Sequence, residues 1–260
     1  MRKFSWMVFL LPFAAPAAAQ APAVPDWALP DSPTHHQVPP PPDFHRDTVT
    51  LNQPIGQFEN QSDVGGALVP GSASFDAASR TYAITAAGYN IWYSRDEFRF
   101  LWKRMTGDVS LSASVDWPQE DGFGDRKAVL IVRQSLEDDS PQIMAAQHGA
   151  GMTHIAWRPG KGAMMTDVEY RAQRQPVAAK GERGPQILHP ARIGLEKKGD
   201  QFQLYVSWQG EPLHAEGAPV TFKADGPFFV GIGFTSHLPA TTATVTLRDV
   251  VVENRAGAVR

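Results

Sequence analysis

Residues 108–117, DVSLSASVDW, decide the fold class of this chain. Every second residue from Val109 to Trp117 is apolar, and the residues between them are three serines and an aspartate. Successive side chains of a β-strand point to opposite faces, so a half-buried strand shows this alternation. The stretch therefore predicts a strand with one face in a core and the other face in water.

Segments of the same kind recur on both sides of this stretch. Clusters of Gly, Pro, Asp and Asn separate short apolar or alternating segments at residues 80–85, 98–105, 127–134, 142–148, 152–158, 191–197, 201–208, 228–234 and 242–252. Gly199-Asp200 and residues 149–151 have the composition of hairpin turns. No stretch long enough for a typical helix has a helical period. Many short strands separated by turns predict an all-β chain folded as a two-sheet antiparallel β-sandwich.

The first residues have the order of a secretory signal peptide. Arg2 and Lys3 precede the apolar run from Phe4 to Ala15, and small residues at 17–19 precede Gln20. Such a segment is typically cleaved, so we expect residues 1–19 to be removed and the protein to be periplasmic or secreted. No later stretch approaches the length of a membrane span, so we expect no stable membrane insertion after cleavage.

The remaining chain divides by composition. Residues 20–46 are rich in proline, including Pro39 to Pro42, and lack apolar periodicity, which is typical of an extended leader or linker. The predicted sandwich occupies residues 47–255, and residues 256–260 form a short polar tail. About 240 residues is a length that a single β-sandwich often has, so we expect one domain.

Composition excludes two classes of chemistry. The chain has no cysteine, so neither disulfides nor thiol redox reactions contribute. Without Arg2 and Lys3, the 24 Lys and Arg become 22 against 27 Asp and Glu, a net charge near −5. A protein with this balance does not attract nucleic acid through its overall charge.

The segment from Gly56 to Asn254 also carries family motifs. In order they are residues 56–60 with 63–65, 70–76, 88–92, 98–102, 107–108, 126–130, 133–136, 148–149, and 231–233 before Ser236-His237. The segment resembles the concanavalin A-like (jelly-roll) domain of exported bacterial proteins, especially the module before the β-propeller in TolB-like biopolymer transporter proteins. It is also similar to laminin-G-like and DUF1349-type sandwiches. In one departure, Arg99 stands where the resemblance leads us to expect a histidine.

Strand pairing places candidate ligand residues on one face. Residues 127–134 are apolar on both faces, which indicates a central strand. If residues 142–158 form a hairpin about Ala150, the core face receives Ile143, Ala145, Ile155 and Trp157. The opposite face then receives Gln142, His148, His154 and Arg158.

These placements suggest a ligand site on the concave face of a sheet. Its candidate residues are Trp92, Trp102, Lys127, Arg133, His148 and Arg158, together with His237 at a strand end. Guanidinium groups bind carboxylates and sulfates, and aromatic rings stack on sugars, so convergence of these side chains would suit an acidic sugar. The alternative is that the cations are solvated or paired locally and that the tryptophans lie in the core.

Metal and catalytic signals are weaker. Glu120, Asp121 and Asp125 form an acidic loop that would suit a structural calcium ion, the only cofactor that we consider. The histidines lack the close spacing of a zinc site. Asp167 and Glu169 share a strand face but match no known catalytic carboxylate motif.

Three functions fit these observations. The first is an exported module that binds carbohydrate or another cell-envelope polymer through its concave face, without catalysis. The second is a small carbohydrate-active enzyme, either a glycoside hydrolase or a lyase, which would have a cleft with converging ionisable groups. The third is a structural envelope protein with flat, locally satisfied faces and no pocket.

Overall fold

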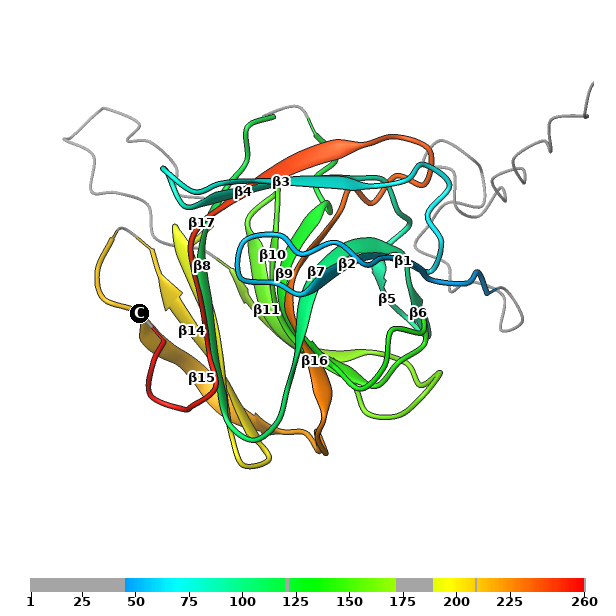
Figure 1. Cartoon of the computed structure of the whole chain (residues 1–260). Helices are drawn as coiled ribbons and strands as arrows, with labels where there is room; N and C mark the ends of the chain where they lie inside the picture. The colour runs from blue at the N-terminus through cyan, green and yellow to red at the C-terminus, as the bar shows by residue number, and fades with distance from the viewer. Residues whose placement is uncertain (1–44, 120–121, 172–188, 209, 260) are drawn as a thin grey trace, which may run out of the picture.

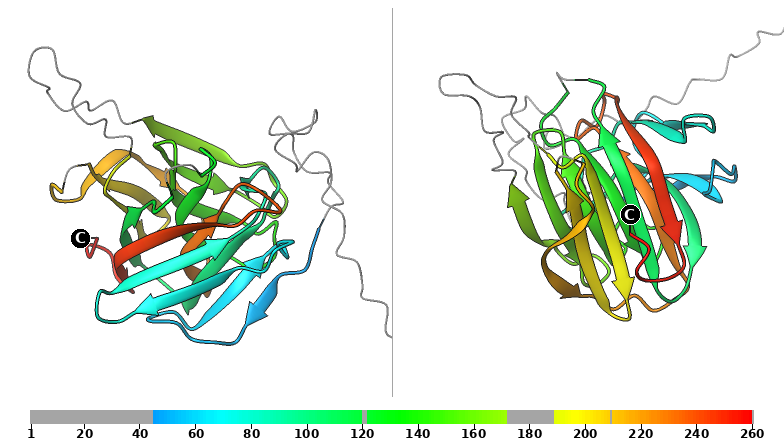
Figure 2. Two further views of the ribbon diagram at one scale, coloured as in Figure 1. Left: turned by 90° about the horizontal axis from the view of Figure 1, so that it is seen from above. Right: turned by 90° about the vertical axis from the view of Figure 1, so that its left-hand side faces the viewer.

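The computed structural model describes residues 45–119, 122–171, 189–208 and 210–259, and these residues form two packed β-sheets (Figure 1). The described residues include no helix and therefore no helical segment that could cross a membrane. All strand pairs within the sheets are antiparallel. The predicted all-β, two-sheet sandwich is therefore confirmed, and Figure 2 shows its layers from two further directions.

One sheet has eight strands. Its order is β1 (Val49–Leu51), β2 (Asn60–Val64), β7 (Phe98–Met105), β16 (Phe228–Thr235), β9 (Lys127–Arg133), β10 (Gln142–His148), β11 (Met152–Arg158) and β12 (Thr166–Arg171). β16 comes late in the chain but lies between β7 and β9, as the crossing connections of a jelly roll require.

The second sheet has seven strands. Its order is β15 (His214–Thr221), β14 (Gln201–Ser207), β13 (Arg192–Lys198), β8 (Val109–Asp116), β17 (Ala243–Glu253), β4 (Thr81–Ala86) and β3 (Ser72–Asp76). A small third pair, β5 (Ile91–Trp92) and β6 (Arg95–Asp96), belongs to neither sheet.

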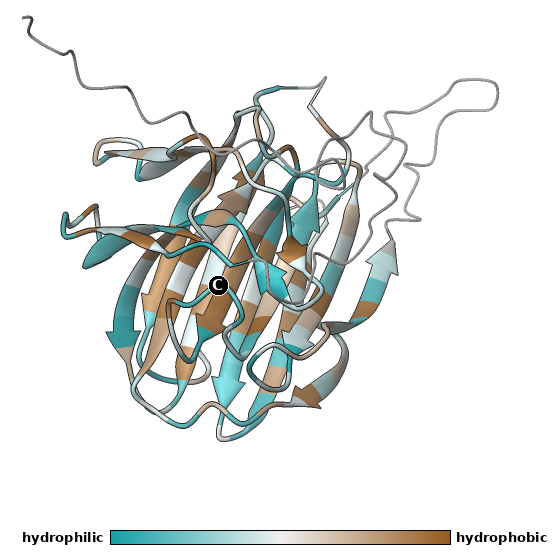
Figure 3. Ribbon diagram, turned by 90° about the vertical axis from the view of Figure 1, so that its right-hand side faces the viewer, coloured by the Kyte–Doolittle hydropathy of each residue, from teal (hydrophilic) through white to brown (hydrophobic). Residues whose placement is uncertain are grey.

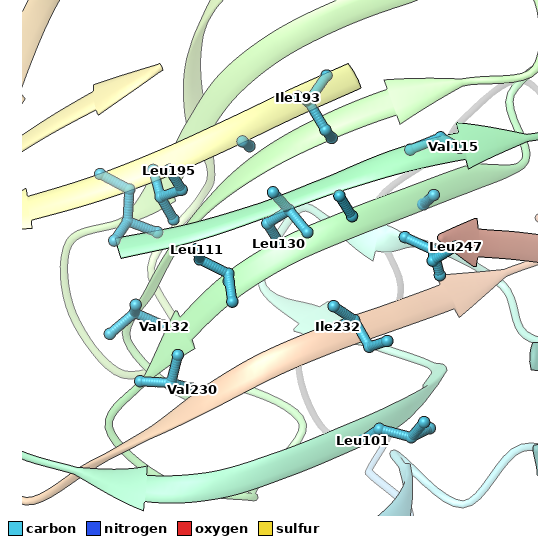
Figure 4. Packing of buried hydrophobic residues seen from close by; sticks show 14 of the residues in the cluster. Leu101, Leu111, Val115, Leu130, Val132, Ile193, Leu195, Val230, Ile232 and Leu247 are labelled. Carbon is cyan, nitrogen blue, oxygen red and sulfur yellow. The ribbon is translucent and has the colours of Figure 1, made fainter. Parts of the chain in front are cut away.

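The main core fills the space between the two sheets. Leu111 and Ile193 of one sheet and Leu130 and Ile232 of the other are fully buried in it (Figure 4). Full burial of such a side chain contributes about 1.5–3 kcal/mol relative to exposure. Apolar and polar residues alternate along the strands, as Figure 3 shows, because each strand turns one face to this core.

The ten predicted strands are all present, with each end within one residue of its predicted place. The turns at residues 149–151 and 199–200 connect β10 to β11 and β13 to β14. β9 lies between β16 and β10 and is buried along its whole length, so its central position is confirmed. The predicted hairpin register is also confirmed, because Gln142 pairs with Arg158 and Ala145 with Ile155.

The solvent-facing side of β8 was predicted incorrectly. Ser110 and Ser112 are fully buried rather than in water. The hydroxyl of Ser110 donates to the carbonyl of Arg255 and accepts from the amide of Ala258, while Arg192 donates to Ser112. The residues after β17 therefore cover part of this face of β8.

The outer face of the eight-stranded sheet, which points away from the main core, is also largely covered. A second apolar cluster lies there, consisting of Val64, Ile91, Phe98, Phe100, Trp102, Val129, Ile131, Met144, Ala146 and Ala156. Ile91 brings β5 into this cluster, so the β5–β6 pair packs over the sheet. The middle of the face that we expected to be concave is thus not an open groove.

Candidate functional site

Polar side chains occupy the two ends of the outer face. On β9, Lys127 and Arg133 lie on this face at opposite ends, with the apolar Val129 and Ile131 between them. Six residues of a β-strand span about 20 Å, at about 3.3 Å per residue. The predicted ligand residues therefore divide: Arg133 and Arg158 lie in one cluster, and Trp92, Lys127, His148 and His237 lie in another. The clusters are in contact where Arg158 Nη2 donates to the carbonyl of Trp92 at 3.4 Å, and Trp102 belongs to neither.

The first cluster is built around Asp96 of β6, which has no exposed side-chain surface. Arg158 binds it in a bidentate manner, with Nη1 2.9 Å from Oδ2 and Nη2 2.7 Å from Oδ1. Arg133 Nη1 lies 2.6 Å from Oδ2, and Gln142 Nε2 donates to Oδ1 at 3.2 Å. Both arginines are fully buried. They bind a carboxylate, as predicted for guanidinium groups, but this carboxylate belongs to the protein itself.

The charge of Asp96 is stabilised by this pairing. Burial alone would raise its pKa, but attraction to Arg158 and Arg133 and the hydrogen bonds that they donate outweigh burial and lower the pKa. Asp96 was not predicted from the sequence, because the two-residue strand that carries it gives no periodic signal. We name Asp96, Arg133, Arg158 and Gln142 the Asp96 cluster.

The second cluster lines a pocket of about 90 Å³ at the other end of the outer face. Its lining residues come from β5, β9, β10, β11 and β12 and from nearby loops: Asn90, Trp92, Asp125, Lys127, His148, Met152, His154, Asp167, Glu169 and His237. We call it the outer-face pocket. Four of the predicted ligand residues, Trp92, Lys127, His148 and His237, meet here.

Lys127 lies in the floor of the pocket and is only 2% exposed. Its Nζ donates to the carbonyl of Ile91 at 3.3 Å and lies 5.2 Å from the centroid of the Trp92 ring. Burial lowers the pKa of Lys127 to about 8, and attraction to Asp125 and Asp96 opposes this shift only in part. The amine is therefore mostly charged at neutral pH but close to titration.

Two buried histidines connect two carboxylates across the pocket. Asp167 Oδ2 lies 3.0 Å from His154 Nδ1, and His154 Nε2 lies 3.3 Å from His148 Nε2. At the other end, His148 Nδ1 lies 3.7 Å from Asp125 Oδ1. We name these four residues the histidine relay.

The hydrogen-bond pattern determines the tautomers. A carboxylate only accepts, so His154 donates its Nδ1–H to Asp167 and offers the lone pair of Nε2 to His148. His148 then donates from Nε2, and its Nδ1 carries a lone pair. This Nδ1 is buried and makes no hydrogen bond. A proton added at Nδ1 would face Asp125, so the relay has a place for one additional proton.

Both imidazoles favour the neutral form. Burial, followed by repulsion from Lys127, lowers the pKa of His148 to about 3, although Asp125 acts in the opposite direction. The pKa of His154 is lowered as well, mainly by burial and against its hydrogen bond with Asp167. Groups with strongly shifted pKa values gathered in a pocket are typical of sites that transfer protons.

The accessible rim of the pocket is acidic. The side chains of Asp125 and Asp167 are 36% and 22% exposed, and Glu169 is exposed. The contact with His148, together with attraction to His237 and Lys127, lowers the pKa of Asp125 in spite of partial burial. Asp125 thus presents a carboxylate at the rim of the pocket, beside the partly exposed side chain of Asp167, whereas His148 and His154 are buried.

The remaining predicted residues have other surroundings. His237 has φ 64° and stacks on Phe123, with ring centroids 5.0 Å apart. Trp102 lies outside the pocket, where its Nε1 donates to Ser62 and its ring packs against Phe229. These contacts explain why Trp102 is buried, whereas Trp92 is half buried beside the pocket.

The predicted calcium loop is only partly visible. Glu120 and Asp121 lie outside the described residues, and Asp125 belongs to the outer-face pocket. Among the described side chains, His45, Asp138 and Asp139 form the one group of three potential metal ligands. Asp138 already pairs with His45 at 2.9 Å and with Arg95 at 3.8 Å.

Several parts of the pocket were predictable from the sequence, but their combination in one pocket was not. His154 was placed on the face of His148, and Asp167 and Glu169 were placed on one strand face. The missing element was β12, whose pairing sets Glu169 opposite His154 and Asp167 opposite Ala156. Asn90 and Met152 had no signal of their own beyond their position near turns.

Comparison with known proteins bears on the fold. No protein-family model matches the chain, and the curated proteins give no match either. A functionally unknown protein from Saccharomyces cerevisiae has a similar structure, with a TM-score of 0.51 and 13% identity over 81% of this chain and 97% of that chain.

Two weaker likenesses are an alginate lyase and the exoplasmic/lumenal domain of VIP36. The alginate lyase from Klebsiella pneumoniae gives a TM-score of 0.43 and 12% identity over 71% of this chain and 84% of that chain. The exoplasmic/lumenal domain of VIP36, in its Ca²⁺- and Man3GlcNAc-bound form, gives a TM-score of 0.41 and 9% identity over 72% of this chain and 85% of that chain. At these identities the likenesses concern only the jelly-roll sandwich.

Proposed function

Because the chain folds as a concanavalin A-like jelly-roll sandwich with an ionisable pocket on its outer face, we propose that it binds a carbohydrate there and hydrolyses a glycosidic bond. One observation carries the proposal: the histidine relay joins two accessible carboxylates, Asp125 and Asp167, within one pocket. A site of this kind contains both a group that can donate a proton and a group that can accept one.

Glycoside hydrolysis requires these two roles. One carboxyl group protonates the leaving oxygen, and the other acts as a base or a nucleophile on the opposite side of the bond. In our proposal Asp125, whose pKa is lowered, stays a carboxylate and acts as the base or nucleophile, and Asp167, which receives a proton through His154, acts as the acid. His148 and His154 hold the carboxylates in place and return the proton between them after each cycle, because His148 Nδ1 has a free lone pair facing Asp125.

The chemistry of the lining favours a sugar as the ligand. Trp92 offers a half-buried aromatic surface, on which the apolar face of a sugar ring can stack. Asn90 and the carboxylates offer hydrogen-bonding groups for hydroxyls. The proposal includes export to the periplasm or beyond, as residues 1–19 predict, and a kinship with the sandwich module of TolB-like proteins.

A carbohydrate-binding module without catalysis is the second candidate. A glycoside hydrolase is expected to have a cleft, and small-molecule sites commonly have a volume of about 300 Å³ or more. The outer-face pocket has a volume of only about 90 Å³, which favours the module. A purely structural protein is less well supported, since that hypothesis expects flat faces without a pocket and the described residues form one.

The test is a cleavage assay of the mature protein against a panel of exported and cell-envelope glycans. New reducing ends are measured together with the ultraviolet absorbance of unsaturated products. Asp125→Asn and Asp167→Asn should each lower the release of reducing ends at least 100-fold. Asp225→Asn is the matched control, because Asp225 is 75% exposed and pairs only with Lys223 among the described contacts.

The outcomes separate the hypotheses. Reducing ends that depend on Asp125 and Asp167 support hydrolysis. Unsaturated products would instead indicate a lyase. Binding of a glycan without any product would favour the module, and activity unchanged in both variants would refute the assignment of the site.

A further inference from the structure

The two imidazoles of the histidine relay come from neighbouring strands and approach each other through the same atom. His148 ends β10 and His154 lies within β11, so the hairpin turn at residues 149–151 brings both side chains together on the outer face. Their Nε2 atoms are 3.3 Å apart, and both side chains are almost completely buried. A separation of six residues along the chain is no zinc motif, so only the structure reveals this pair of nitrogens.

A carboxylate lies beside the other ring nitrogen of each histidine. Asp167 Oδ2 is 3.0 Å from His154 Nδ1, and Asp125 Oδ1 is 3.7 Å from His148 Nδ1. Because a carboxylate only accepts hydrogen bonds, the hydrogen of each imidazole is best placed on Nδ1. Both Nε2 atoms would then present lone pairs to each other, an arrangement that is favourable only with a cation between them.

Without such a cation, one histidine has to adopt the less favourable tautomer. His148 places its hydrogen on Nε2 and donates it to His154, so its Nδ1 carries a lone pair toward Asp125. This Nδ1 is buried and makes no hydrogen bond, which costs free energy. A cation bound to both Nε2 atoms would let the hydrogen of His148 move to Nδ1, where it faces the carboxylate.

The spacing of the two rings fits a tetrahedral metal ion. Zinc binds imidazole nitrogens at about 2.0–2.1 Å, so two nitrogens on one tetrahedral ion lie about 3.3–3.4 Å apart. The centre of each ring lies about 1.15 Å behind its nitrogen, which places the two centroids about 5.2 Å apart. The Nε2 atoms of His148 and His154 are 3.3 Å apart, and their ring centroids are 5.1 Å apart. The hairpin therefore already holds both nitrogens at the separation that zinc requires.

We propose that His148 and His154 bind one divalent transition metal ion of the zinc type through their Nε2 atoms, with Asp125 and Asp167 orienting the two rings. A carboxylate behind the second ring nitrogen is the usual partner of a metal-binding histidine. Imidazole nitrogens favour zinc-type ions, whereas Ca²⁺ and Mg²⁺ prefer oxygen ligands. The pocket of about 90 Å³ has room for water molecules that complete the coordination.

The ammonium of Lys127 opposes the ion. It lies in the floor of the same pocket and repels positive charge on both imidazoles, whereas Asp125 and Asp167 attract it. Replacing this lysine with a neutral residue should therefore strengthen metal binding.

The group formed by His45, Asp138 and Asp139 is a poorer candidate for a metal site. Arg95 lies 3.8 Å from the carboxylate of Asp138, and Lys161 lies 3.6 Å from that of Asp139. These cations already occupy the neighbourhood that a metal ion would need.

The first test titrates Zn²⁺ into the mature protein, without a polyhistidine tag and after treatment with a chelator, by isothermal titration calorimetry at neutral pH. We expect a zinc site whose affinity falls at least about tenfold in His148→Gln and in His154→Gln, because each change removes one of two protein ligands. His214→Gln is the matched control, since His214 is half buried but lies on the edge strand β15 of the other sheet. Its zinc affinity should equal that of the unmodified protein.

Two further variants keep the test decisive if the histidine variants do not fold. Asp167→Ala leaves both ligands in place but removes the acceptor behind His154, so zinc affinity should fall about tenfold or more. Lys127→Met should raise the affinity, because it removes a buried positive charge beside the ion. Circular dichroism confirms that each variant is folded.

NMR of the imidazole nitrogens provides a readout that zinc bound elsewhere would not change. On addition of zinc, the hydrogen of His148 should move from Nε2 to Nδ1. An unchanged tautomer, zinc affinity that is the same in the folded variants, or equally tight binding of Ca²⁺ would each overturn the proposal. The metal site does not depend on the proposed hydrolysis, since zinc binding and glycan cleavage are measured separately.

Discussion

Removing the charge of Asp96 should destabilise the protein far more than removing a surface charge. Asp96 accepts hydrogen bonds from three fully buried side chains, two of which are arginines. Asp96→Asn keeps the shape of the side chain but leaves two buried guanidinium groups without a carboxylate. Breaking a buried ion pair in this way costs about 3–5 kcal/mol.

The expected change in Tm follows from the size of the domain. For a domain of 150–250 residues, 1 kcal/mol corresponds to about 2–4 °C, so Asp96→Asn should lower Tm by roughly 6–20 °C. Asp116→Asn is the control, because its ion pair with Arg248 is about half exposed, with exposed fractions of 46% and 49%. An exposed pair contributes at most about 1 kcal/mol, so the control should lose less than about 4 °C.

Acid should remove the same stabilisation from the unmodified protein. The folded-state pKa of Asp96 is lowered, since its pairing with the two arginines outweighs burial. Its contribution is therefore fully present above the unfolded pKa of about 3.9 and is lost as the pH falls through the folded pKa. Thermal unfolding followed by circular dichroism, at pH 7 and at stepwise lower pH, measures both effects. A Tm for Asp96→Asn within the range of Asp116→Asn would refute this reasoning.

Three further changes have defined outcomes in urea denaturation. The folded-state pKa of Lys127, about 8, lies below its unfolded pKa of about 10.4, so the free energy of unfolding should rise by up to about 3 kcal/mol between pH 8 and pH 10.4. Lys127→Met should lack this gain. Parallel curves of stability against pH for the two proteins would contradict this prediction. Truncation after Asn254 should lower the free energy of unfolding by about 1–3 kcal/mol, because the buried hydroxyl of Ser110 loses two backbone hydrogen-bond partners. An unchanged urea midpoint would argue against this prediction. Gly231→Ala should lower the free energy of unfolding by about 3 kcal/mol, because the added Cβ would lie 1.9 Å from the carbonyl oxygen of Leu101 on β7. In the control Gly160→Ala the added Cβ meets no atom within 4 Å, so stability should not change. Equal effects of the two substitutions would disprove the clash.

Long periodic segments made most of the fold predictable from the sequence. β8 alternates so regularly that the strand and its core face follow from the pattern, although its other face is covered rather than in water. The register of the β10–β11 hairpin follows from placing its turn about Ala150. The strands that sequence analysis missed are short, polar or at sheet edges: β1, β2, β3, β5, β6, β12 and β15. Such strands are specified by their neighbours rather than by their own residues.

The site was harder to predict, because charged residues do not reveal their partners in the sequence. Lys127 and Arg133 lie on the same strand face and looked like members of one patch. The difference between them depends on Asp96 of a two-residue strand, whose carboxylate pairs directly with Arg133, whereas Lys127 donates to the carbonyl of Ile91. Likewise, the contact between Asp167 and His154 could not be predicted without knowing that β12 pairs with β11, the strand that carries His154.

On the proposed function, the β5–β6 pair limits which part of a long glycan could reach the pocket. Residues in the middle of the outer face, such as Phe100, Ile131 and Met144, are fully buried, so a polymer is not able to lie across the sheet. A pocket of about 90 Å³ at one end of that face admits only part of one sugar unit. If the proposed hydrolysis holds, the protein would cleave single units from chain ends, releasing small products while the average chain length falls slowly.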